Sequence, residues 1–141
     1  MGYSQFRRRG RMLRHLLKKM DEEMNLKDEL MELERGFWEA SSDPAYYEAH
    51  MSGDGIAVFA DLILDKADAV KSARENRAGD WTNIRLVSVN LLSLSPDIAA
   101  LVYTGHAERA GIPYAANVIS TYRRGDSGWE MVLHQQSVNA H

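Results

Sequence analysis

Cysteine is absent from the 141 residues, which excludes disulfide bridges, thiolate metal sites and cysteine-based catalysis. Long apolar runs are absent too, since none approaches the roughly 20 residues that a membrane-spanning helix needs. The sequence also lacks a GxGxxG fingerprint, a P-loop, a serine nucleophile elbow and an HExxH motif. What is present, 45% hydrophobic and 26% charged residues, is typical of a globular domain with one core. We expect a single cytoplasmic domain without a cofactor.

Positive charge is concentrated at the N-terminus, whereas the rest of the chain is acidic. Residues 1–20 contain no acid, and their basic residues are Arg7, Arg8, Arg9, Arg11, Arg14, Lys18 and Lys19. The net charge of the chain is −3, so the remainder carries −3 − 7 = −10. We predict a basic, partly helical N-terminal extension over residues 1–22 and a folded domain over residues 23–141. The charge suits nucleic acid or an anionic membrane as a partner, but an extension without such a partner is the favoured interpretation.

Three helices are predicted in the first half of the chain. From Asn25 an apolar stripe at helical spacing runs as far as "SSDP" and predicts a helix with one buried face. Asp43 and Pro44 suit the N-cap and first position of a second helix that ends at "SGDG". A short strand, "IAVFA", separates it from "LDKADAVKSARENR", in which Asp65 is the expected N-cap of a third helix.

From Trp81 onward the hydrophobic period changes to two. Four strands are predicted, over "TNIRLVSVNLLSL", "IAALVYTGHAE", "YAANVISTYRR" and "WEMVLHQQSV". Their connections are so short that consecutive strands must be antiparallel neighbours. The pattern therefore predicts an α+β fold in which helices cover one face of a curved sheet.

Two stretches carry a family resemblance, "FWEASSDPAYYEAHMSGDGIAVF" and "PYAANVISTYRRGDSGWEMVLHQQS". With this order of elements, about residues 25–140 resemble the nuclear transport factor 2-like superfamily, also called cystatin-like or SnoaL-like. The chain is most similar to a domain-of-unknown-function branch, the 4440 group. The resemblance implies a cone: three helices packed in the concave face of a strongly curved, mixed or antiparallel sheet, with a pocket at the open end. It implies little about chemistry, because members include isomerases, cyclases, dehydratases, transport factors and kinase hub domains.

The last hairpin assigns the two faces of the sheet. If Tyr122 lies opposite Trp129, period-two geometry puts Gln135 in the cavity and His134 on the outer face. The resemblance to the association domain of calcium/calmodulin-dependent kinase implies ligand-facing positions at Tyr47, Tyr103 and Ser120. The predicted ligand pocket consists of Trp38, Tyr47, Tyr103, Tyr114, Ser120, Tyr122 and Gln135. Members of the superfamily usually dimerise through the outer face, where the predicted contact residues are Asn117, Ile119, Val132 and His134.

A catalytic base is harder to assign. Ketosteroid isomerases of the superfamily carry an aspartate on the first strand, and alignment of "IAVFAD" with that region leaves Asp61 as the acid to test. Period-two geometry turns Asp61 away from the pocket unless a bulge re-aims it. None of the five histidines has a metal-ligand spacing. For His50 and Asp54, at the end of the second helix, capping is favoured over metal binding, so no metal site is predicted.

Three functions follow from this reading. The first is a homodimeric domain that binds a small organic ligand in a partly apolar pocket, without assured catalysis. The second is an isomerase, cyclase or dehydratase acting on a small organic substrate, which requires a carboxylate or imidazole inside the cavity near a tyrosine hydroxyl. The third is a protein-interaction or assembly module.

Overall fold

The computed structural model describes the backbone of residues 2–139 and the side chains of residues 7–139. Its elements are α1 (Gly2–Glu39), α2 (Pro44–His50), β1 (Met51–Phe59), β2 (Leu62–Asp65), α3 (Lys66–Glu75), β3 (Thr82–Ser95), β4 (Ile98–Arg109), β5 (Ile112–Gly125) and β6 (Gly128–Val138). Asp43 caps α2 by accepting a hydrogen bond from the Ala45 amide, and Asp65 caps α3 through the Asp68 amide. Both predicted N-caps are therefore confirmed.

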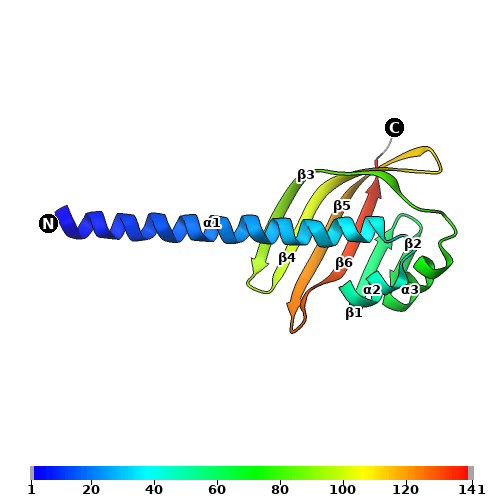
Figure 1. Ribbon diagram of the computed structural model, residues 1–141, viewed down its shortest axis with the longest axis horizontal. Helices are drawn as coiled ribbons and strands as arrows, with labels where there is room; N and C mark the ends of the chain where they lie inside the picture. Colours follow the sequence, from blue (N-terminus) through cyan, green and yellow to red (C-terminus); the bar gives the residue numbers. More distant parts are fainter. Residues whose placement is uncertain (1, 140–141) are drawn as a thin grey trace.

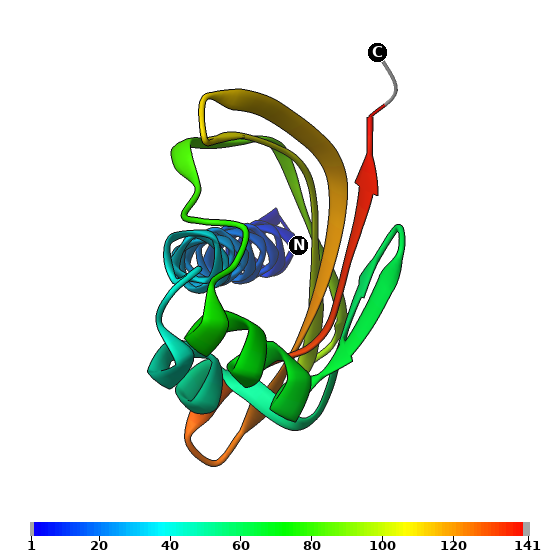
Figure 2. The same ribbon diagram turned by 90° about the vertical axis from the view of Figure 1, so that its right-hand side faces the viewer.

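The strands form one sheet with the order β2-β1-β6-β5-β4-β3. β1 runs parallel to β6, and every other neighbouring pair is antiparallel. The sheet curves around α1, which is seen end-on in Figure 2, and α2 and α3 lie beside it on the concave side. The predicted α+β fold, with three helices in the concave face of a strongly curved mixed sheet, is confirmed.

The first half of the sheet differs from the prediction of a single strand. α2 ends at His50, and the "SGDG" stretch belongs to β1 rather than to a turn. A Cβ atom at Gly55 would lie 2.9 Å from the Ser52 carbonyl oxygen and 3.1 Å from that of Met131. Only glycine therefore fits where the pairing of β1 with β6 is irregular. β2 is antiparallel to β1, with pairs from Phe59–Leu62 to Ile56–Asp65. It has only four residues, too few for a hydrophobic period to predict a strand.

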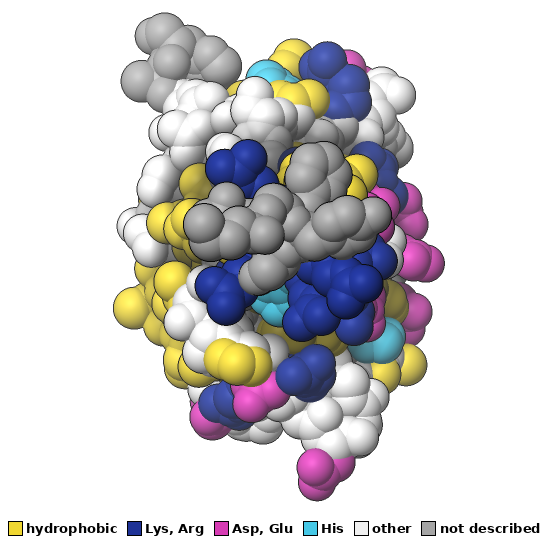
Figure 3. Space-filling view, turned by 90° about the vertical axis from the view of Figure 1, so that its left-hand side faces the viewer, with side chains coloured by type: hydrophobic (Ala, Val, Ile, Leu, Met, Phe, Trp, Pro, Cys, Tyr) yellow, Lys and Arg dark blue, Asp and Glu magenta, His cyan; other side chains and the backbone are white. Residues whose placement is uncertain are grey.

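α1 is one continuous helix that passes through the predicted boundary at residue 22 without a break. Its N-terminal half extends well beyond the sheet (Figure 1), and every side chain from Arg11 to Asn25 is exposed. Seen from that end, Lys and Arg side chains gather around the helix (Figure 3). The first fully buried side chain of the described part is Leu30. Within residues 2–139, no helix is both long enough and apolar enough to cross a membrane.

The core lies between the C-terminal half of α1 and the inner face of β4, β5 and β6. Its largest members include Leu30, Phe37, Trp38, Leu101, Tyr103, Val118, Tyr122 and Met131. A glycine on β4 makes the closest approach possible. A Cβ atom at Gly105 would lie 2.8 Å from the Trp38 ring, so the absence of a side chain lets the indole lie on the strand.

The register of the last hairpin corrects the predicted faces of β6. Tyr122 pairs with Met131 rather than with Trp129, and Thr121 pairs with Leu133. Val132 is therefore an extra residue in β6, a bulge that reverses the alternation of side chains beyond it. His134 consequently lies on the inner face opposite Ser120, and Gln135 lies on the outer face opposite Ile119.

Candidate functional site

The centre of the site is an acid inside the core. Leu30, Glu34, Phe37 and Trp38 follow one another at helical spacing on α1, so the apolar stripe carries Glu34 into the concave side of the sheet. Its side chain is 0% exposed. A buried carboxylate is costly unless it is paired and hydrogen-bonded, so its partners decide whether it stays ionised.

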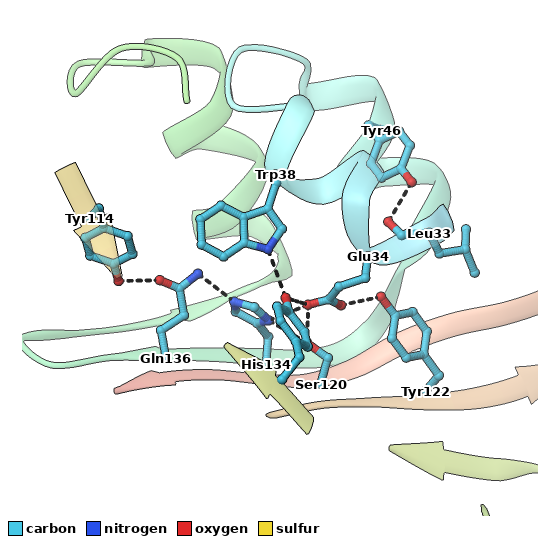
Figure 4. Close-up of polar contacts among 10 residues, drawn as sticks. Leu33, Glu34, Trp38, Tyr46, Tyr114, Ser120, Tyr122, His134 and Gln136 are labelled. Atoms are coloured by element: carbon cyan, nitrogen blue, oxygen red, sulfur yellow. Dashed lines mark hydrogen bonds and ion pairs between the residues drawn. The ribbon is translucent and has the colours of Figure 1, made fainter. Parts of the chain in front are cut away.

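Three hydroxyl groups from the sheet surround the Glu34 carboxylate (Figure 4). Tyr122 donates to Oε1 at 2.6 Å, while Ser120 donates to Oε2 at 2.7 Å and Tyr103 donates to the same oxygen. Tyr103 in turn accepts a hydrogen bond of 2.9 Å from the Trp38 indole nitrogen. All the hydroxyls donate to Glu34, which suits a charged carboxylate.

The titration behaviour follows from this packing. Burial raises the pKa of Glu34, but the hydrogen bond and charge interaction with His134 and the hydroxyl donors outweigh it, so its pKa lies below the ordinary value. Burial and the negative charge of Glu34 raise the pKa of Tyr103 and of Tyr122 well above the ordinary tyrosine value. The cluster therefore holds one carboxylate surrounded by neutral phenols.

His134 connects this cluster to the open end of the cone. Its Nδ1 lies 2.7 Å from Ser120 Oγ and 3.5 Å from Glu34 Oε2. Because the Ser120 hydroxyl donates its one hydrogen to Glu34, Nδ1 must carry the proton that is shared with Ser120. A carboxylate thus orients the imidazole through a hydroxyl, with Nε2 left at the far side.

The far side of His134 meets a second pair of polar groups. Gln136 Nε2 lies 3.0 Å from His134 Nε2, and Gln136 Oε1 accepts a hydrogen bond of 2.5 Å from the Tyr114 hydroxyl. In this orientation the amide nitrogen of Gln136 faces His134 Nε2, while its amide oxygen faces the Tyr114 hydroxyl. A hydrogen-bonded row therefore runs from Glu34 through Ser120, His134 and Gln136 to Tyr114.

A cavity of about 710 Å³ adjoins this row. It lies between α1, α2, α3 and the neighbouring strands, and the aromatic residues that line it are Phe37, Trp38, Tyr47, Phe59, Trp81 and Tyr114. His134 and Gln136 line the cavity as well. Known small-molecule sites commonly have a volume of this order and apolar walls with a few polar groups.

Arg109 also lines the cavity. Arg109, the last residue of β4, has its guanidinium carbon 3.7 Å from the centre of the Trp81 ring. Trp81 and Tyr114 lie with their ring centres 4.8 Å apart, and Trp81 and Trp38 lie 5.5 Å apart. These aromatic rings form a continuous wall that begins at the Glu34 cluster and ends at Arg109.

The predicted pocket residues fall into three groups. The first group lines the cavity and consists of Trp38, Tyr47 and Tyr114. The second group points into the cone but lies outside the cavity lining, with its hydroxyls bonded to Glu34; it consists of Tyr103, Ser120 and Tyr122. Gln135 is exposed on the outer face because of the bulge at Val132, so its predicted place in the pocket is wrong. Gln136, one residue further, has that place.

Asp61 lies in the turn between β1 and β2 and lines the cavity at an exposed position. None of the hydrogen bonds between described side chains joins it to a tyrosine. Among residues 7–139 no group of three or more His, Asp or Glu side chains is arranged to hold a metal ion. Asp54 bonds to Arg123 and Ser52 instead of meeting His50.

The predicted dimer face needs one correction. His134 is buried inside the cone and is not available on the outer face, whereas Asn117 and Ile119 are exposed there. Leu133 takes the outward position that His134 was expected to have, and it is 40% exposed. Val132, the bulged residue, is half-buried.

Sequence reasoning missed Glu34, Trp81, Arg109 and Gln136. A signal existed for Glu34, because it stands at position i+4 from Leu30 and therefore within the apolar stripe. No comparable signal marked Arg109, whose environment is created by Trp81 from the start of another strand.

Comparison with protein-family models found no match, and comparison with curated protein sequences found none either. Solved structures do match. An NTF2-like protein from Cytophaga hutchinsonii has a TM-score of 0.70 at 8% identity, with 79% of this chain and 97% of that chain covered. A protein of unknown function with a cystatin-like fold from Nostoc punctiforme has a TM-score of 0.67 at 20% identity, with coverages of 80% and 90%. The association domain of C. elegans CaMKII has a TM-score of 0.65 at 15% identity, with coverages of 83% and 98%.

These matches identify the class: the chain has the nuclear transport factor 2-like, or cystatin-like, fold. The predicted superfamily resemblance is therefore confirmed at the level of the fold. The closer resemblance to the domain-of-unknown-function branch stays a prediction.

Proposed function

We propose that this protein binds a small organic molecule with an apolar body in the cavity between α1, α3 and the sheet. The observation that carries the proposal is a cavity of about 710 Å³ with aromatic walls and a short row of polar groups at one side. Sites of this kind use their apolar walls for affinity and their few polar groups for orientation.

Gln136 and Tyr114 are the groups that orient the ligand. Both line the cavity, and each is half-buried and bonded to the other. His134 is held from behind by Ser120 and Glu34, so it cannot turn away when a ligand enters. The row is therefore preorganised, which lowers the entropic cost of binding.

Cavity filling tests the proposal. Ser72 is exposed on α3 and lines the cavity, so Ser72→Phe places a ring in its mouth without disturbing the core. Ala67, exposed on the same helix outside the cavity lining, provides the matched control Ala67→Phe. Methyl NMR of Met51 and Met131, which also line the cavity, reports binding of neutral aromatic fragments. Fragment-induced shifts that survive Ser72→Phe as well as Ala67→Phe would exclude this cavity as the site.

A second function, acid–base catalysis, is favoured by His134. Its imidazole lines the cavity, and Nδ1 is fixed by Ser120 and Glu34, so a substrate that displaces the Gln136 amide meets a basic Nε2. Removal of a proton from carbon beside a carbonyl group is one step that isomerases, cyclases and dehydratases can use.

Deuterium exchange tests this step. Small cyclic ketones in D₂O should gain deuterium beside the carbonyl faster with the wild-type protein than with His134→Gln, which retains a hydrogen-bonding side chain but no base. Equal exchange rates for the two proteins, measured by mass spectrometry, would exclude His134 as the catalytic base.

Self-association is the third function, and exposed apolar residues on the outer face of the sheet support it. Ile119 is 45% exposed and lies on the same strand as Asn117, and the adjacent strand β6 carries Leu133 and the half-buried Val132, another predicted contact residue. Ile119→Glu and Leu133→Glu should each shift a dimer towards monomer in sedimentation, because an unpaired charge at an interface is costly. Ala67→Glu on α3 is the control. A wild-type chain that sediments as a monomer at high concentration contradicts the assembly.

A further inference from the structure

Arg109, at the end of β4, differs from the two arginines Arg123 and Arg124 of the neighbouring strand β5. Arg123 is paired with Asp54 at 2.9 Å, and Arg124 is paired with Asp97 at 2.9 Å, although both pairs are on the surface. Arg109 is less exposed than either, yet none of the ion pairs among residues 7–139 includes it. Half-buried Arg109 thus lacks the counter-charge that exposed Arg123 and Arg124 have.

The immediate surroundings of Arg109 are aromatic. Its guanidinium carbon lies 3.7 Å over the Trp81 ring, so one face of the guanidinium is covered. Its Nε is buried without a hydrogen-bond partner among the described residues. Stacking on an aromatic ring leaves the in-plane N–H groups of a guanidinium free, and those groups match a carboxylate in a two-point arrangement.

No acidic side chain among the described residues forms an ion pair with Arg109. Burial lowers its pKa, while the charge interactions with Tyr114, Tyr47 and Asp80 raise it again without direct contact. An arginine still remains protonated at neutral pH. Arg77, the other basic residue of the cavity lining, is 84% exposed and has its own partner, Glu75, at 3.3 Å.

We infer that the cavity binds a monocarboxylate with an apolar body, whose carboxylate pairs with Arg109 at the Trp81 side while the body extends towards Gln136 and His134. This inference rests on the proposed function and adds the chemical class of the ligand. A single unpaired guanidinium suits a monoanion, and a phosphate ester would require more positive charge than the lining provides.

Matched probes test the inference. 3-Phenylpropanoate and 3-phenylpropanamide have the same body and differ only in charge. Calorimetry on the full chain should show about tenfold or tighter binding of the acid, since hydrogen bonds to charged groups exceed neutral ones by roughly that factor. Arg109→Gln should remove the preference for the acid over the amide. Arg85→Gln, an equal change of charge at an exposed position of β3 outside the cavity lining, should keep it.

Each outcome decides between the two proposals. If the amide binds and the acid binds no better, the inference fails and the small-molecule function survives. If neither probe binds at millimolar concentration, both fail. If 2-phenylethyl phosphate binds the wild-type chain more tightly than the acid does, the carboxylate class is wrong. Because the probes are compared on the wild-type chain, the decision stands even where Arg109→Gln does not fold.

Discussion

The two halves of α1 reverse the ordinary rule of burial. In the N-terminal half, Leu13 is 59% exposed and Met20 is 57% exposed, whereas in the C-terminal half the acid Glu34 is 0% exposed. The helix is continuous, so the difference does not arise from backbone structure. It arises from what lies opposite: the sheet faces the C-terminal half only (Figure 1). Burial in this molecule is decided by the partner surface more than by the polarity of the side chain.

The comparison also separates two sources of stability. The N-terminal half depends on its own helix propensity, because every side chain from Arg11 to Asn25 is exposed. The C-terminal half contributes a core in which the desolvation of Glu34 is offset by three hydroxyl donors and His134. Substitutions in the two halves should therefore have very different effects on the free energy of unfolding.

The largest effect is expected for Glu34→Ala. The change leaves Tyr103, Ser120 and Tyr122 without their shared acceptor and opens a cavity, so the free energy of unfolding should fall by about 3–5 kcal/mol. Denaturant unfolding followed by tryptophan fluorescence measures this. A loss below about 1 kcal/mol would show that the cluster contributes little to stability.

Glu34→Gln separates charge from shape. It should cost less, about 2 kcal/mol, because the amide oxygen still accepts from the hydroxyls. The pKa of Glu34 is lowered in the folded state, so its contribution is complete above the unfolded pKa of about 4.3 and is lost as pH falls through the folded value. The difference between wild type and Glu34→Gln should stay constant above about pH 5.5 and shrink below about pH 4. A difference that grows towards low pH contradicts the assignment of a charged Glu34.

The next effect compares the same substitution in both halves of the helix. A Cβ atom at Gly36 would lie 1.8 Å from the Tyr46 hydroxyl oxygen, which donates to the Leu33 carbonyl oxygen at 2.8 Å. The Tyr46 ring is packed edge-on against Phe37 and cannot simply turn aside. Gly36→Ala should therefore destabilise by about 1–3 kcal/mol, despite the helix propensity that alanine gains.

Gly10→Ala is the matched control, because a Cβ atom at Gly10 meets nothing within 4 Å. The substitution should stabilise the local helix by up to about 1 kcal/mol and so raise the helix content slightly. The main unfolding transition should stay unchanged. Circular dichroism and thermal unfolding measure both variants. Equal shifts of the unfolding temperature in the two variants would contradict the division of α1 into two environments.

Local signals explain which parts of the structure could be predicted. The N-caps Asp43 and Asp65 depend on a few adjacent residues, and the four-strand meander depends on period two and short turns, so both follow from the sequence. The superfamily resemblance added the cone. By contrast, the bulge at Val132 depends on how β6 fits between β1 and β5, which no local pattern encodes.

The missed site residues have the same cause. One extra residue in β6 exchanged the positions of His134 and Gln135. His134 therefore left the predicted dimer face, and Gln135 left the predicted pocket. Glu34 was not predicted because acids are seldom buried, and its burial depends on the hydroxyls of Tyr103, Ser120 and Tyr122. The cone interior of β5 was predicted correctly, since its alternation from Tyr114 to Tyr122 is unbroken.

A smaller effect is expected when the exposed half of α1 is removed. Deletion of residues 1–22 takes away the basic segment but no buried described side chain. The unfolding temperature of residues 23–141 should therefore change by less than about 4 °C, the shift that about 1 kcal/mol gives in a domain of this size. Calorimetry of the two chains tests the predicted boundary. A large loss of stability would mean that the extension belongs to the folded domain.

The smallest effect concerns a carboxylate outside the core. Asp54, on the exposed part of β1, accepts hydrogen bonds from Arg123 and Ser52, which lower its pKa to about 2. Because the folded pKa is depressed, any contribution to stability is present above the ordinary value of about 3.9 and is lost as pH falls towards 2. Carboxyl ¹³C NMR should give a titration midpoint of about 2 for Asp54, and Arg123→Gln should move this midpoint back towards the ordinary value.

The unfolding temperature of Arg123→Gln at neutral pH should hardly differ from that of the wild type, since exposed ion pairs are screened by solvent. Thus the two carboxylates, both with lowered pKa values, are expected to differ in stability effect because only Glu34 has lost its water. A destabilisation by Arg123→Gln comparable with that of Glu34→Ala would refute this distinction.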